Sequence, residues 1–82
     1  MKLLTDELLK DVVDQMIENY QKGKFDITQK LAKSILQKKP NHILSLKILG
    51  SIYEQKGKLN DALIINKKTV ELEDKDSESY NN

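Results

Sequence analysis

The side chains that could support chemistry are few in this chain. His42 is the single histidine, cysteine is absent, and all fourteen basic residues are lysine. One imidazole with no second histidine or cysteine offers neither acid–base machinery nor a metal-ligand set. No Ser/His/Asp grouping, phosphate-binding glycine loop or pair of catalytic carboxylates is present. We therefore expect no enzyme activity and no cofactor, and we expect His42 to be a surface residue.

The charges are segregated along the chain, although the formal net charge is only +1. Residues 1–21 carry two lysines against five acids, residues 22–39 carry six lysines against one acid, and residues 71–82 carry one lysine against five acids. Specific recognition of guanine, phosphate or carboxylate normally uses the arginine fork, which this chain lacks. Phe25 is the single aromatic residue of the basic segment. We expect solvated faces, with neither nucleic acid nor a membrane as partner.

An internal repeat organises the elements that carry these residues. The segment over residues 15–28 reappears in similar form over residues 50–62, with an offset of 34 residues that carries Gly23 onto Gly57. A repeat of this length, made of two helices, cannot bury its apolar face alone and stacks on another copy. Stacks of this kind present surfaces to partners, so the repeat favours a binding module.

The apolar spacing is helical throughout, without the two-residue alternation of a strand. We expect helix pairs over residues 5–39 and 41–73. Gly23 and Gly57 should end the first helix of each pair, and Pro40 should end the first pair. Residues with capping side chains precede each expected helix: Thr5, Asp26, Asn41 and Asn60.

The second repeat resembles the tetratricopeptide repeat (TPR) family, whose pattern sets a leading Leu or aromatic residue, Leu-Gly, Tyr, Ala, an aromatic residue and Pro at fixed spacings. The residues that match are Leu46, Leu49, Gly50, Tyr53 and Ala62. The resemblance implies an all-α, TPR-like α-solenoid in a single domain, residues 1–82. Repeat one would span about 9–42, repeat two about 43–76, and a partial third repeat, 77–82, would start a fifth helix. A generic four-helix bundle is the structural alternative.

The chain departs from the family pattern at three points. Repeat one has Met16 and Thr28 where repeat two has its glycine and alanine, so its helices should lie slightly farther apart. Repeat two has Asn66 where a buried ring is usual. Asn66 is either buried with partners for its amide or partly exposed.

The resemblance implies that the first helix of each repeat lines a concave face, which would take an apolar peptide or helix. On this face the chain would present Lys10, Val13, Asp14, Ile17 and Tyr20 from the first helix, and Leu44, Lys47, Ile48, Ser51 and Glu54 from the third. Val13, Ile17 and Ile48 stand where carboxylate-clamping relatives use lysine and asparagine, so we expect no such clamp. Alanine at Ile17 and Ile48 should weaken partner capture without unfolding the chain.

Two further interpretations stay open. Two helix pairs fall short of the three repeats that such stacks usually need, so a second copy could cover the C-terminal end. The residues expected there are Leu63, Val70, Leu72 and Tyr80. Alternatively, the chain is the N-terminal docking or oligomerisation arm of a longer bacterial protein, such as a TPR-fused transferase. The composition, rich in lysine, asparagine and isoleucine without arginine or cysteine, favours a bacterial, cytoplasmic protein.

Overall fold

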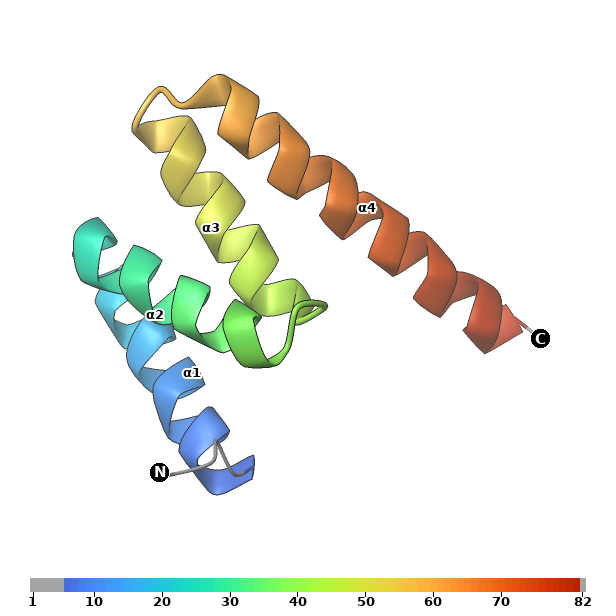
Figure 1. Ribbon diagram of the computed structural model, residues 1–82, viewed down its shortest axis with the longest axis horizontal. Helices are drawn as coiled ribbons and strands as arrows, with labels where there is room; N and C mark the ends of the chain where they lie inside the picture. The colour runs from blue at the N-terminus through green and yellow to red at the C-terminus, as the bar shows by residue number, and fades with distance from the viewer. Residues whose placement is uncertain (1–5, 82) are drawn as a thin grey trace.

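The chain folds into four α-helices connected by short turns (Figure 1). The computed structural model describes the backbone of residues 6–81 and the side chains of residues 7–75. The helices are α1 (Asp6–Gln21), α2 (Phe25–Lys38), α3 (Ile43–Gln55) and α4 (Leu59–Asn81). Because no strand occurs between residues 6 and 81, the predicted all-α class is confirmed.

The α1–α2 and α3–α4 turns share one backbone geometry. Gly23 and Gly57 each have a φ of 76°, a left-handed conformation that favours glycine. In each turn the glycine N–H donates to the carbonyl three residues earlier, and the next N–H donates to the carbonyl five residues earlier. The N···O distances of these four bonds lie between 2.8 and 3.1 Å. The repeat seen in the sequence therefore extends to the hydrogen bonds that end α1 and α3.

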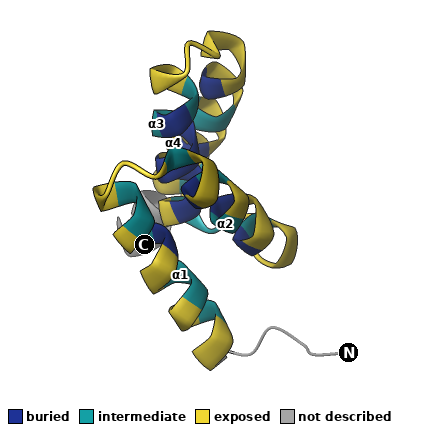
Figure 2. Cartoon of the chain, turned by 90° about the vertical axis from the view of Figure 1, so that its left-hand side faces the viewer, coloured by how far each residue is buried: buried dark blue, intermediate teal, exposed yellow. Residues whose placement is uncertain are grey.

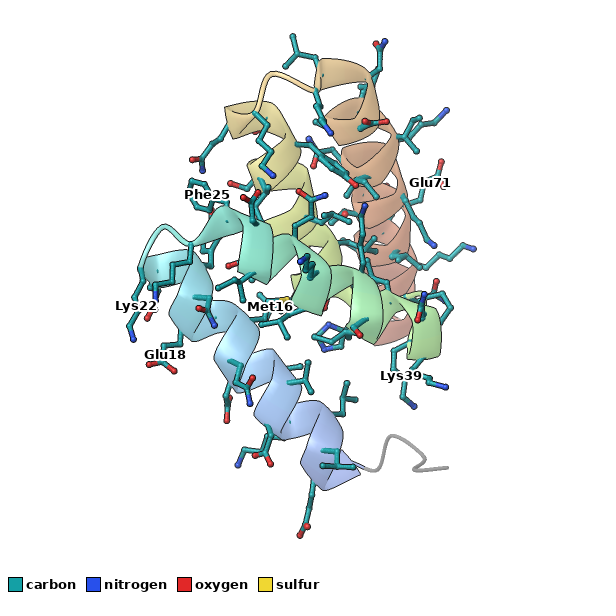
Figure 3. All side chains as sticks on the ribbon, turned by 60° about the vertical axis from the view of Figure 1, so that its left-hand side comes forward. Met16, Glu18, Lys22, Phe25, Lys39 and Glu71 are labelled. Carbon is teal, nitrogen blue, oxygen red and sulfur yellow. The ribbon has the colours of Figure 1, made fainter. Side chains whose placement is uncertain are left out.

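Helix α3 is the central element of the packing. It contacts both α2 and α4, and α1 packs against α2. Figure 2 shows buried residues gathered where these helices meet, with exposed residues along the outer sides. Met16 points from α1 into the same region (Figure 3). The core cluster consists of Met16, Ala32, Ile35, Ile48, Leu49 and Ile52.

Helices α2 and α4 do not start at the predicted capping residues. Helix α2 follows Lys24, which makes no side-chain cap bond, and Asp26 lies inside its first turn. Asn60 likewise lies within α4, after Leu59. In both helices the tight turn after the glycine starts the helix earlier than the side-chain pattern predicts. Thr5, the cap expected for α1, lies outside the described residues.

His42, and not Asn41, caps α3. The Nδ1 atom of His42 accepts a hydrogen bond from the N–H of Ser45 at 3.2 Å and lies 2.7 Å from the Ser45 Oγ. An imidazole nitrogen therefore replaces the side-chain oxygen that usually caps a helix. His42 is partly buried and holds the start of α3 in place.

The expected fifth helix does not form, because α4 continues without a break to Asn81. Pro40 follows the end of α2, but the equivalent position of the second repeat is Asp74, which does not interrupt a helix. Residues 59–81 contain neither glycine nor proline. Consequently the last turns of α4 project to one side of the molecule (Figure 1).

Polar side chains within the packed helices have partners. Thr28 and Thr69 are buried, and each hydroxyl donates to the carbonyl four residues earlier, at 2.8 and 2.9 Å. Asn66 is partly exposed, and its Nδ2 donates to Glu54 Oε1 at 2.9 Å. Between the two alternatives for Asn66, the structure shows the partly exposed one.

Candidate functional site

The ten residues predicted for the partner-binding face differ in exposure. Lys10, Asp14, Leu44, Lys47 and Glu54 are exposed, and Val13, Ile17, Tyr20 and Ser51 are partly buried. Ile48 is buried. We call the first nine residues the α1–α3 face.

A hydrogen bond brings two members of the α1–α3 face together. The hydroxyl groups of Tyr20 on α1 and Ser51 on α3 lie 2.7 Å apart, although the residues are 31 positions apart in the sequence. The Tyr20 ring also packs against Phe25, with 5.8 Å between ring centroids. The Tyr20–Ser51 bond joins the C-terminal end of α1 to α3.

Ile48 does not belong to this surface. It is only 6% exposed and is part of the core cluster. The expectation that Ile48→Ala leaves the fold intact is therefore wrong, because truncating a buried isoleucine removes core packing. A signal for this burial was present in the sequence: α3 has apolar residues on most of its circumference, and such a helix is usually buried. The residues concerned are Ile43, Leu44, Leu46, Ile48, Leu49 and Ile52.

Two other residues predicted for the partner-binding face interact with side chains of α4. Lys47 forms an ion pair with Glu73 at 2.7 Å, and Glu54 accepts the hydrogen bond from Asn66. Both interactions are solvent-exposed, so each contributes at most about 1 kcal/mol. Lys47 and Glu54 therefore edge the α1–α3 face on its α4 side and help to orient α4 on α3.

Two surface hollows are lined by described residues, and none of the ten predicted residues lines either of them. One has a volume of about 510 Å³ and lies between α1 and the α2–α3 turn. Its lining residues are Leu9, Lys38, Lys39, Pro40, Asn41 and His42. The second, about 390 Å³, lies between α2 and the end of α3. Its lining residues are Asp26, Gln29, Lys30, Lys33 and Lys56. The lysine-rich composition of residues 22–39 was visible in the sequence, but it did not predict either hollow.

Lys56 joins the end of α3 to α2 within the second hollow. Its Nζ donates to Asp26 Oδ1 at 2.7 Å and to Gln29 Oε1 at 2.9 Å. The hydrogen bond from Lys56 and its charge, with a smaller contribution from Lys30, hold the pKa of Asp26 below its ordinary value of 3.8. A lowered carboxyl pKa means that this contact stabilises the fold above the unfolded-state pKa and is lost as the pH falls through the lower, folded-state value.

We expect Lys56→Met to raise the pKa of Asp26 toward 3.8, because methionine keeps much of the apolar stem but neither donates nor carries charge. The measurement is an NMR titration of the Asp26 carboxyl carbon between about pH 2 and 6. Lys68→Met on α4 serves as the control and should leave the titration unchanged. An identical titration in Lys56→Met and wild type would contradict the assignment.

The Tyr20–Ser51 bond gives a second expected result. Tyr20→Phe should lower the free energy of unfolding by about 1 kcal/mol, since one partly buried hydrogen bond is lost. Ser51→Ala should have a similar effect. The double variant should lose clearly less free energy of unfolding than the two single variants lose together, as measured by urea denaturation. Strict additivity would show that the two hydroxyl groups do not interact in solution.

The C-terminal surface predicted from the sequence is only partly as expected. Leu63 and Val70 are 68% and 55% exposed, whereas Leu72 is partly buried. The side chain of Tyr80 lies outside the described residues. Leu59 is exposed as well, although it was not among the residues predicted for this surface. Since residues 59, 63 and 70 lie on one side of a helix, we call them the α4 stripe.

The α4 stripe has a counterpart on α2. With the 34-residue offset, its residues correspond to Phe25, Gln29 and Leu36. Phe25 and Leu36 pack against the core cluster, and Gln29 accepts a hydrogen bond from Lys56 of the α3–α4 turn. The positions that are covered on α2 are thus exposed on α4.

No protein-family model, curated protein or solved structure matches this chain. The TPR resemblance therefore stays a prediction. No helix within residues 6–81 combines the length and hydropathy of a membrane span.

Proposed function

We propose that this chain is a TPR-like, non-covalent protein-binding module of the bacterial cytoplasm. Its α1–α3 face would receive an apolar peptide or helix from a partner protein. The observation that supports this most is the Tyr20–Ser51 hydrogen bond, because it joins the C-terminal end of α1 to α3 and brings two of the predicted face residues together.

The chemistry of the α1–α3 face fits such a partner. Val13 and Ile17 are partly exposed and Leu44 is exposed, so apolar surface is available from both helices. Lys10 and Asp14 add charges of both signs at the edge. An apolar centre with a mixed polar rim is suited to a helix or extended segment with apolar anchors.

The experiment selects binding peptides from a displayed library and compares two isoleucine truncations. Ile17→Ala on the α1–α3 face should weaken peptide binding by about tenfold, because it removes a contact anchor. Ile27→Ala is the matched control, since Ile27 is exposed on α2, outside the face. Equal affinities for both variants, or no selected peptide at all, would count against the proposal. Thermal unfolding confirms that both variants remain folded.

Self-association is the second candidate function, and the exposed α4 stripe favours it. Three apolar side chains on one side of a helix form the kind of patch that marks interaction sites. Leu63→Gln introduces the residue that α2 has at the equivalent position, at a side chain already 68% exposed. We expect this variant to stay folded but to associate more weakly. In sedimentation velocity it should be monomeric at concentrations at which the wild type is still associated. A wild-type chain that is monomeric throughout would exclude this candidate.

A further inference from the structure

The second hollow is rich in lysine side chains. Of its three lysines, Lys56 is paired with Asp26. Lys30 and Lys33 are exposed and have no ion-pair partner among the described residues. They lie three positions apart on α2, so their side chains occupy the same side of the helix.

Helix α4 presents a matching negative pair. Glu71 and Asp74 are exposed, also lie three positions apart, and have no ion-pair partner among the described residues. Their neighbour Glu73 is already paired with Lys47. Glu71 points away from α1 and α2 on the outer side of α4 (Figure 3). The exposed Val70 of the α4 stripe directly precedes this pair.

The two pairs do not meet within one chain. Helix α2 packs against α1 and α3, whereas α4 packs against α3. Lys30 and Lys33 thus lie on a different surface from Glu71 and Asp74. Complementary patches that a chain cannot join internally are available to a second molecule.

We propose that a second copy of this chain joins them, with α4 of each copy lying along α2 of the other. Glu71 and Asp74 of one copy would face Lys30 and Lys33 of the other, and a two-fold axis would repeat the contact. The aliphatic stems of the lysines would cover Val70, which precedes Glu71, while their ammonium groups reach the carboxylates. This inference rests on the proposed self-association through α4 and specifies the surface that α4 contacts.

Helix α1 offers a competing acidic pair, Asp11 and Asp14, with the same spacing. Both residues are exposed. We favour α4 because Leu63 and Val70 add exposed apolar surface beside its carboxylates, whereas Val12 and Val13 of α1 already pack against the core. Apolar burial is what gives such a contact affinity, since exposed ion pairs alone contribute little.

The experiment measures self-association by sedimentation equilibrium in three variants. Lys30→Glu with Lys33→Glu should weaken association by at least about tenfold, because attraction becomes repulsion. Glu71→Lys with Asp74→Lys should do the same. Mixing these two variants should restore association near the wild-type strength, since every reversed pair then meets its complement. Asp11→Lys, at an exposed residue of α1 outside the α1–α3 face, is the control and should have little effect on self-association. Added salt should weaken the wild-type association.

The outcomes separate this inference from the self-association on which it rests. If the wild type associates but both reversals on α2 and α4 leave it unchanged, the proposed contact is wrong and self-association stands. If Asp11 proves decisive, α1 is the partner surface and the inference fails. If the wild type is monomeric at all concentrations, both proposals fail. Circular dichroism confirms that the exposed substitutions leave the helices intact.

Discussion

Ile52→Ala is expected to lower the free energy of unfolding by about 2–5 kcal/mol. The side chain of Ile52 is 0% exposed and belongs to the core cluster. Since a chain of this length has a total stability of roughly 4–12 kcal/mol, this one truncation should remove a large share of that stability. Urea denaturation followed by far-ultraviolet circular dichroism measures the change.

The matched control is Ile64→Ala, the same truncation at a side chain that is 67% exposed on α4. It should change stability by no more than about 0.5 kcal/mol. Ile52 is buried because α3 is the central helix and has other helices on both sides. Helix α1 is not central, and its residue equivalent to Ile52 in the repeat is the exposed Glu18. Similar losses for Ile52→Ala and Ile64→Ala would show that α3 is not the buried centre.

Gly50→Leu should destabilise the fold by about 3 kcal/mol, because α3 and α4 must separate to admit the side chain. A Cβ atom at position 50 would already meet Asn66 Oδ1, and it would lie 3.3 Å from Asn66 Cγ. Asn66 cannot move away without changing its hydrogen bond to Glu54. Thermal or urea unfolding of the purified variant gives the measurement.

The smaller variant Gly50→Ala tests whether Asn66 is the cause. Alanine improves helix propensity by about 1 kcal/mol, which opposes the crowding. We expect Gly50→Ala to destabilise the wild-type chain and to stabilise the Asn66→Ala chain, where the crowded amide is gone. The coupling between the two positions should be about 1–2 kcal/mol. If Gly50→Ala has the same effect in both backgrounds, the close approach is not at Asn66.

The order of the four helices and their turns could be predicted from the sequence, whereas the expected fifth helix does not form. Apolar periodicity identified all four helices, and Gly23 and Gly57 marked turns that need a left-handed backbone. Both signals are local, since each depends on residues within one helix or one turn. Pro40 likewise marked the end of α2, and its replacement by Asp74 explains why α4 continues.

Features that depend on packing between helices were harder to predict. Ile48 has the spacing of a face residue, but it becomes buried because α3 is covered on several sides. His42 could cap α3 only once the α2–α3 turn had placed Nδ1 near the N–H of Ser45. The second hollow combines Asp26 with Lys56, which are 30 positions apart, so no local pattern reveals it.

The measurement that tests the central claim most directly is the mapping of a selected peptide onto the chain by NMR. The peptide comes from the displayed library and is titrated into the isotope-labelled protein, and amide chemical shifts are followed residue by residue. The account predicts that the largest changes occur in α1 between Lys10 and Tyr20 and in α3 between Leu44 and Glu54. Changes confined to α2 or α4, with α1 and α3 unaffected, would contradict it.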